Sequence, residues 1–329
     1  STFVGLGVAL GHLERYEEAL ESCQKAIDLD PEYVNAWVNR GKALHHLKRY
    51  EEALESLLKA LELAPKSVDA WVHQGAALRT LERYEEALES FQKALDLDPK
   101  SVDAWVNRGK TLNNLERYEE ARESFQKALY LAPKSVDAWV NQGASLYNLE
   151  RYEEALESYQ KALDLDPKSV KDWVNRGAAL LHLKRYEEVL TTCERVFMID
   201  SKNHQALNTQ ALALSLLNNF EKAITAIDEA INLEPKEVLH RANRGIILAR
   251  YSRYTEALAD CEQAIKQDPK HESGYYGKAC CYALQGDIGQ AIDNLQKAID
   301  IAPRRSRNEA KHNPDFDSIR DDERFRALM

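Results

Sequence analysis

Apolar and polar positions follow one another along this chain with helical spacing, and the pattern returns every 34 residues up to about Arg305. In the copy that begins at Val68, large apolar residues occupy the fourth, eleventh and fourteenth positions, as Trp71, Leu78 and Leu81. A short polar turn leads to a second stripe, spaced by three and four residues: Tyr84, Ala87, Leu88, Phe91, Ala94 and Leu95. Such spacing places apolar side chains on one helical face. Each copy is therefore predicted to form two antiparallel helices.

Signals for helix ends recur with the same period. Ser67 stands before the first helix, where its hydroxyl can accept an otherwise unpaired backbone N–H. Gly75, at the eighth position, is expected to let the partner helix approach closely. Pro99 follows Asp98 and is expected to end the second helix, because proline cannot continue it.

A fixed period of this length is typical of a stacked array, in which each repeat buries its apolar face against its neighbours. We count nine repeats, which begin at residues 1, 34, 68, 102, 136, 170, 204, 238 and 272. The repeats span residues 1–305, and 306–329 break the pattern as a predicted capping helix and tail. The tail is expected to fold back onto the ninth repeat, because its apolar pairs have helical spacing: Phe316/Ile319 and Phe325/Leu328.

Seven positions of the repeat resemble the signature of the tetratricopeptide repeat. In the third repeat these are Trp71, Gly75, Tyr84, Ala87, Phe91, Ala94 and Pro99. The resemblance covers about 305 of the 329 residues. It implies an all-α fold, an α-solenoid that winds as a right-handed superhelix, with the first helix of each repeat lining a concave groove. The segment from Asn313 to Phe325 is similar to the tail of many bacterial members of this family.

Composition narrows the class of protein. The chain is 44% aliphatic and aromatic and 30% charged, which is too apolar for disorder and too charged for a membrane protein. A net charge of −10 argues against nucleic acid as the main ligand. No stretch approaches 18 consecutive apolar residues and no signal peptide is visible, so we expect no membrane partner.

The five cysteines are an odd number without Cys-x-x-Cys spacing. Cys23, Cys193 and Cys261 share the repeat position that holds Phe or Tyr in other copies, which indicates core thiols. Cys280 and Cys281 are adjacent on one predicted helix and cannot face the same site. Reduced thiols are typical of the cytosol, so we expect a cytoplasmic protein.

Catalytic and metal sites are not expected. His12 and His46 share the thirteenth position in adjacent repeats, but no Cys or carboxylate joins them at ligand spacing. The glycines at the eighth position are isolated, so they form no phosphate loop. An open stack encloses no Ser/His/Asp or Cys/His set. We therefore expect no enzyme activity, no cofactor and no metal.

Positions 2, 5, 6, 9, 12 and 13 form a second stripe on each first helix, which is expected to line the groove. Four of the nine differences between the third and fourth repeats fall on this stripe, which fits either ligand tuning or free drift of exposed positions. Position 6 is Asn in five repeats, and an amide can both donate to and accept from a peptide backbone. This is similar to the asparagine ladder of O-GlcNAc transferases, although Gly5, His73, Thr209 and Gly277 interrupt it.

The candidate peptide-binding groove comprises fifteen residues: Asn39, Lys42, His46, His73, Arg79, Asn107, Lys110, Asn114, Asn141, Tyr147, Asn148, Asn175, His182, Asn243 and Arg250. A clamp for a C-terminal carboxylate, as in chaperone-binding members of the family, is not expected, because valine holds position 5 in five repeats. Towards the C-terminus the stripe becomes more apolar and basic, with Leu212, Leu216, Ile246, Arg250 and Tyr276.

These features favour a non-enzymatic scaffold that binds an extended peptide or a partner helix in the groove. A second interpretation is the sensor or substrate-recruiting arm of a larger enzyme or signalling protein. It fits an expected excision from a longer chain, since the first repeat lacks its first position and Ser1 is not preceded by Met. A third is a structural spacer that self-associates end to end.

Overall fold

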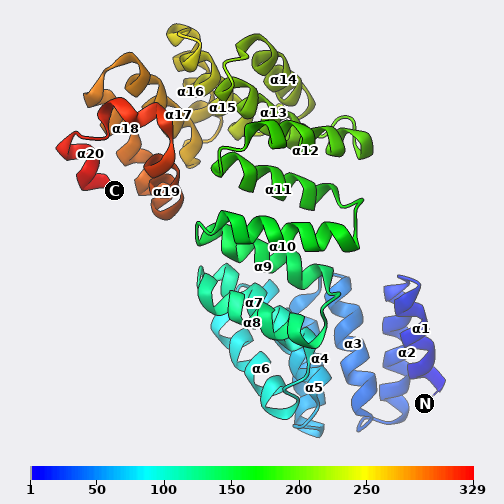
Figure 1. Cartoon of the computed structure of the whole chain (residues 1–329). Helices are drawn as coiled ribbons and strands as arrows, with labels where there is room; N and C mark the ends of the chain where they lie inside the picture. Colours follow the sequence, from blue (N-terminus) through cyan, green and yellow to red (C-terminus); the bar gives the residue numbers. More distant parts are fainter. Residues whose placement is uncertain (1) are drawn as a thin grey trace. The chain divides into compact units, whose positions relative to one another are not determined.

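A computed structural model describes residues 2–329, without the side chains of Thr2 and His12. Ser1, and with it the expectation drawn from the start of the chain, lies outside the described residues. Within that range the fold is all-α, and the helices follow one another as stacked hairpins, as predicted (Figure 1). The chain divides into two compact units, Ser1–Leu149 and Glu150–Met329, called here the N-terminal and C-terminal units.

The N-terminal unit contains α1 (Thr2–His12), α2 (Tyr16–Leu29), α3 (Val34–His46), α4 (Tyr50–Leu63), α5 (Val68–Thr80), α6 (Tyr84–Leu97), α7 (Val102–Asn114), α8 (Tyr118–Leu131) and α9 (Val136–Asn148). The C-terminal unit contains α10 (Tyr152–Leu165), α11 (Val170–His182), α12 (Tyr186–Ile199), α13 (His204–Leu216), α14 (Phe220–Leu233), α15 (Val238–Arg250), α16 (Tyr254–Gln267), α17 (Glu272–Gln285), α18 (Ile288–Ile301), α19 (Pro303–His312), the 3₁₀ helix η1 (Pro314–Ile319) and α20 (Glu323–Leu328).

The predicted serine caps are confirmed. The Ser67 hydroxyl accepts the backbone N–H of Ala70 at 3.3 Å, and the other copies do the same at Ser101, Ser135 and Ser169. Each tryptophan also anchors the start of its helix, since the indole N–H of Trp71 donates to the carbonyl of Pro65 at 2.9 Å. The indole is therefore held to the preceding loop as well as packed in the seam between repeats.

The turn between the helices of a repeat has one conformation throughout. After α5, Glu82 takes a left-handed φ of 59°, its N–H donates to Arg79, and the N–H of Arg83 donates to Leu78. These two bonds define a Schellman motif, which satisfies the last carbonyls of the helix. The left-handed residue of the last repeat is Gly286, but the earlier ones carry a Cβ: Glu14, Lys48, Glu82, Glu116, Glu150, Lys184, Asn218 and Ser252.

The seam inside a repeat depends on a glycine facing a large side chain. Phe91 is fully buried, and a Cβ on Gly75 would lie 2.6 Å from its ring. Leu57 and Phe125 fill the corresponding place against Gly41 and Gly109. The five cysteines are buried free thiols, as expected for core positions. The periodic stripes therefore form a series of small hydrophobic cores within each of the two units.

Substituting Gly75 by Ala is expected to lower the free energy of unfolding by about 1–3 kcal/mol, because the added methyl forces the Phe91 ring aside. Urea unfolding followed by circular dichroism measures this. The control is Gly5→Ala, because nothing lies within 4 Å of a Cβ there. That variant should gain up to about 1 kcal/mol from helix propensity. Equal stability of Gly75→Ala and wild type would show that the seam is loosely packed.

The C-terminal segment packs back on the last hairpin, as the spacing of its apolar residues predicted. Helix α19 begins at Pro303, directly after α18. The proline that was expected only to end a helix therefore also occupies the first position of the next one. The tail then places its apolar side chains in one cluster with residues of α17 and α18: Phe316, Ile319, Phe325 and Leu328.

Candidate functional site on the first helices

In the N-terminal unit, the first helices of successive repeats, α3, α5, α7 and α9, lie side by side. Ion pairs join them across this surface. Lys42 of α3 reaches Asp69 of α5 with an N–O distance of 2.6 Å, and Lys110 of α7 reaches Asp137 of α9 at the same distance. We call the surface formed by positions 2, 6, 9, 12 and 13 of these helices the inner face, because every side chain there is exposed or half-buried.

Position 5 does not belong to this surface, contrary to the expected stripe. Val38, Val72 and Val106 are buried and pack into the hydrophobic clusters between hairpins. The physical reason is that each first helix packs on both its own partner and the preceding repeat. The buried face of the helix is therefore wider than packing on a single neighbour would make it.

The asparagines at position 6 are oriented by their own helix. The side-chain amides of Asn39, Asn107 and Asn141 donate to the carbonyl four residues earlier, at 2.8, 2.9 and 2.7 Å. An amide has two N–H donors and an oxygen acceptor, so one donor is used within the helix. Asn114 and Asn148 at position 13 are exposed, while Tyr147 at position 12 is half-buried.

Imidazole and cationic groups gather where α3 and α5 meet. His73 lies 3.1 Å from the carboxylate of Asp69, which Lys42 also contacts. Burial alone would raise the pKa of Asp69, but the hydrogen bonds from His73 and Lys42 outweigh it and lower that pKa to about 2. Burial, helped by the charges of neighbouring His46, His73 and Arg79, lowers the pKa of His45. One carboxylate thus faces several cationic or titratable groups.

Arg79 stands out within this cluster. Its Nε is buried and, among the residues that the structure describes, has no hydrogen-bond partner. Burial also lowers the pKa of its guanidinium, against the opposing charge of Asp137. Most buried polar atoms in proteins are hydrogen-bonded, so this unpaired N–H is an exception that requires an explanation.

The remaining histidines of the predicted groove are held by aromatic neighbours. The ring of His46 stacks on Tyr16 with centroids 4.4 Å apart. His12, its counterpart in the first repeat, has a side chain outside the described residues. In the described part of the chain, no three His, Cys, Asp or Glu side chains lie close enough to hold a metal ion.

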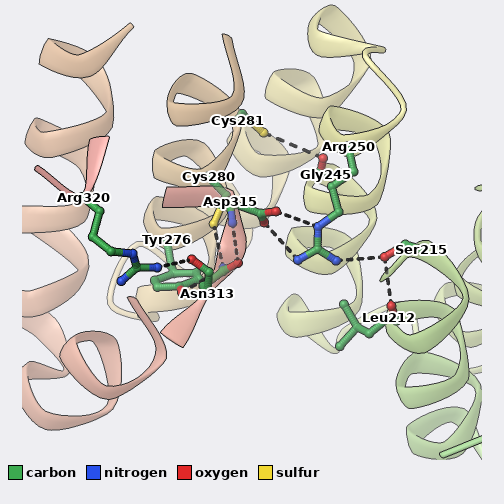
Figure 2. Close-up of polar contacts among 10 residues, drawn as sticks. All are labelled: Leu212, Ser215, Gly245, Arg250, Tyr276, Cys280, Cys281, Asn313, Asp315 and Arg320. Atoms are coloured by element: carbon green, nitrogen blue, oxygen red, sulfur yellow. Dashed lines mark hydrogen bonds and ion pairs between the residues drawn. The ribbon is translucent and has the colours of Figure 1, made fainter. Parts of the chain in front are cut away.

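In the C-terminal unit, the chain's own tail covers predicted groove residues. The guanidinium of Arg250 binds both carboxylate oxygens of Asp315, at 2.8 and 3.0 Å (Figure 2). Asn243 is buried and donates to Asn208 at 2.9 Å, so it is not presented to a ligand as a member of an amide ladder. The structure thus places Arg250 and Asn243 against partners from their own unit. Asn175, by contrast, is half-buried.

His182 also has partners from its own unit. It stacks on Tyr152 with centroids 4.5 Å apart. Burial first, and then the charge of His312 from the tail, lower its pKa to about 4. His312 in turn lies 3.1 Å from a carboxylate oxygen of Glu150. The tail therefore reaches from the last hairpin of this unit to the first.

Sequence reasoning missed two residues of these surfaces. His45 shares position 12 with Arg79, and that shared position was the available signal. Asp315 belongs to a tail that was assigned only to capping, and nothing in its spacing marks the carboxylate as a partner of Arg250. Both appear only when contacts between distant parts of the chain are known.

A pair of histidines in the C-terminal unit predicts a pH-dependent stability. Nδ1 of His204 lies 2.8 Å from Nε2 of His240, which is buried. Burial, and then the charge of His204, lower the pKa of His240 to about 4, while Glu237 acts in the opposite direction. The fold therefore favours the neutral ring. Its stabilising contribution is complete above the unfolded pKa, near 6.5, and is lost as the pH falls towards about 4.

Thermal unfolding between pH 7.5 and 4.5 should show this loss, at most about 3 kcal/mol. A His240→Gln variant should lose less stability over the same interval, since glutamine does not titrate. Parallel pH curves for the two proteins would contradict the assignment.

The fold defines a helical-repeat protein built from stacked hairpins. The sequence profile of the tetratricopeptide repeat matches residues 4–68, 72–136, 208–272 and 252–306, and further profiles of this repeat match 136–169 and 158–191. The chain therefore belongs to the tetratricopeptide repeat family, as the seven signature positions indicated. No curated protein matches the chain.

Solved structures with the same fold include YrrB, described as a tetratricopeptide repeat protein with an unusual peptide-binding site. YrrB is 26% identical, with a TM-score of 0.50 over 57% of this chain and 96% of its own. A tetratricopeptide repeat protein from Parabacteroides merdae is 18% identical, with a TM-score of 0.65 over 72% of this chain and 93% of its own. PilF of Pseudomonas aeruginosa is 22% identical, with a TM-score of 0.55 over 61% and 92%. The last two show the fold alone.

Apolar stretches in the described helices fall short of what a bilayer span requires. Tetratricopeptide repeats mediate protein–protein interactions, and scaffolds of this fold are usually non-catalytic.

Proposed function

We propose that this protein is a non-enzymatic interaction protein whose inner face in the N-terminal unit binds an extended, acidic segment of a partner. The unpaired Nε–H of the Arg79 guanidinium carries the proposal, because a carboxylate that approaches this group would supply the missing acceptor. The guanidinium is already partly removed from water, so pairing it costs less desolvation than pairing a fully hydrated cation.

The surroundings of Arg79 support an acidic ligand. His45, His73 and Lys42 lie on the same two helices, and Asp69 is the carboxylate that His73 and Lys42 share. Two cationic side chains, Lys42 and Arg79, thus lie in this cluster, whereas the chain as a whole carries −10. Such a patch attracts a negatively charged segment and fixes its position.

The position-6 amides support an extended backbone in the ligand. Asn107 and Asn141 stand one repeat apart and are held by their own helices. Asn107 keeps an oxygen and a second N–H with which a peptide bond can pair, whereas Asn141 keeps its oxygen, because its amide also donates to the Asp137 carboxylate at 2.8 Å. Fixed amides lose little entropy on binding, which favours an ordered peptide over a contact to mobile side chains. The similarity to YrrB, whose structure is described as having a peptide-binding site, is in keeping with this mode.

The test begins with an array of random acidic dodecapeptides, and the tightest binder is then measured by fluorescence anisotropy. Arg79→Gln is expected to weaken binding at least about tenfold, as hydrogen bonds to charged groups contribute about 1.5–3 kcal/mol. The matched control is Arg83→Gln, four residues on, whose guanidinium is exposed and paired with Glu86 at 2.6 Å. Equal affinity of wild type and Arg79→Gln would reject the acidic-ligand site.

The amides are tested separately. The variant with Asn39, Asn107 and Asn141 replaced by Ala should bind the same peptide more weakly whatever the peptide's side chains are. If it binds as well as the wild type, the ligand backbone does not follow the asparagines.

A further inference from the structure

Residues 313–319 make contacts beyond those needed to cover the exposed end of the last repeat. Helices α19 and α20 pack on α18, the exposed helix of the last hairpin, and Ser306 ties α19 to the carbonyl of Ala298 at 2.9 Å. Between them, η1 turns away and lies on α17, while its Asp315 reaches Arg250 on α15 (Figure 2). Helix α15 already has α13 and α17 as neighbours in the stack, so this contact is additional to the cap.

The guanidinium of Arg250, which binds Asp315, is held in place by other residues of the stack. Arg250 gives two parallel hydrogen bonds to the carboxylate, and its remaining NH1 donates to the hydroxyl of Ser215 on α13 at 2.9 Å. That hydroxyl donates to the carbonyl of Leu212 at 2.9 Å. The side chains of Arg250 and Asp315 are 12% and 4% exposed. A fork held from behind by the scaffold is the usual geometry for recognising a carboxylate.

Phe316, the next residue, fills an apolar pocket. Its ring is fully buried and meets Tyr276 edge-on, with centroids 5.7 Å apart. The first helices contribute Ile246 on α15 and Cys280 and Ala283 on α17 to the cluster around it. Residues of α18 and the tail's own Phe325, whose ring centroid lies 5.7 Å from that of Phe316, complete the cluster. A charged anchor beside a buried aromatic anchor is the composition expected of a binding hot spot.

Asn313 fixes the backbone that presents these two side chains. Its amide donates to the Tyr276 hydroxyl at 3.1 Å, and its oxygen accepts the N–H of Asp315 at 3.0 Å. Arg320 closes the turn by donating to the Asn313 carbonyl at 2.9 Å. The segment therefore contacts the repeats through directional hydrogen bonds as well as through buried apolar side chains.

We propose that the surface of α15 and α17 formed by Arg250, Ile246, Tyr276, Cys280 and Ala283 is a second peptide-binding site, which the chain's own tail occupies in cis. Its ligand is a turn-forming segment of another protein that carries an Asp directly before a Phe, preceded by Asn two residues before the Asp. The site lies in the C-terminal unit and is independent of the acidic-ligand site around Arg79.

A tethered ligand governs access to such a site. A short linker gives the tail an effective concentration of about millimolar, so a weak partner cannot compete while the tail fits. Any change that weakens the tail without altering α15 and α17 should open the site. Opening of the site in such a variant would indicate that the tail is a ligand bound in cis, and not a segment that only packs on the last hairpin.

The probe is a fluorescein-labelled synthetic peptide with the sequence of residues 313–320, Asn-Pro-Asp-Phe-Asp-Ser-Ile-Arg. Full-length Asp315→Asn, whose tail has lost its carboxylate, is expected to bind the probe at least about tenfold more tightly than wild type does. A probe with Asn in place of its first Asp should not bind. Adding Arg250→Met to Asp315→Asn should abolish binding, while adding Arg79→Gln should leave it unchanged.

Circular dichroism establishes that each variant keeps its helices. If Asp315→Asn loses them, Phe316→Leu replaces it, because leucine keeps most of the buried volume. Failure of both folded variants to bind the probe would overturn the proposal and leave the tail as packing. Concentration-dependent dimerisation of the variants that excludes the probe would also overturn it, by assigning the site to a second copy.

Discussion

Replacing Arg250 by Ala is expected to lower the free energy of unfolding of the C-terminal unit by about 3–5 kcal/mol. The carboxylate of Asp315 would remain buried without its bidentate partner, and the loss of an ion's partner costs more than the intact pair contributes. Urea unfolding followed by circular dichroism measures the change, and hydrogen exchange locates it in α13, α15, α17 and the tail.

Two controls define the cause. Arg83→Ala removes an exposed pair with Glu86 and should cost less than about 1 kcal/mol. The double variant Arg250→Met with Asp315→Leu should recover much of the lost stability, since no charge is then left buried. A cost for Arg250→Ala as small as that for Arg83→Ala would mean that water reaches the carboxylate.

Replacing Phe125 by Ala is expected to lower the free energy of unfolding of the N-terminal unit by about 3–5 kcal/mol. The ring is fully buried, and it faces Gly109 at a distance that leaves no room for a Cβ. Removing it creates a cavity that the surrounding helices fill only in part, because their own seams with neighbouring repeats hold them in place. Calorimetry or urea unfolding measures the loss.

The chain supplies its own control for this substitution. Leu57 fills the equivalent place in the second repeat, against Gly41. Phe125→Leu should therefore cost less than half as much as Phe125→Ala, as hydrophobic changes that keep most of the volume are tolerated best. Equal costs for the two variants would indicate that the shape of the ring, and not the filled volume, is required.

Much of the fold could be predicted from the sequence because the same local signals recur in repeat after repeat. The serine before four of the first helices, the glycine at position 8 and the apolar stripes all indicate the same hairpin, and the structure confirms each of them. The left-handed turn was not predicted. Its usual signal is glycine, and here Glu82 and its counterparts take that conformation.

The candidate site was less accessible to sequence reasoning. Position 5 was assigned to the groove because it lies away from the apolar stripe that packs on the partner helix. In the structure, Val72 is buried because α5 packs on α4 of the preceding repeat as well as on its partner α6. Helical periodicity shows which face of a helix is apolar, but it does not show which residues a second neighbouring helix buries. The pairing of Arg250 with Asp315 joins residues 65 apart outside the repeat, where periodicity carries no information.

The recurrent left-handed turns have a practical consequence for protein engineering. A side chain with a Cβ pays about 1 kcal/mol for that conformation, and the chain does so at eight positions from Glu14 to Ser252. The last repeat, with Gly286, does not. These turns are thus places where glycine or asparagine could raise thermal tolerance without altering either proposed binding surface. Copying the final turn into the other repeats is a direct route to a more stable protein.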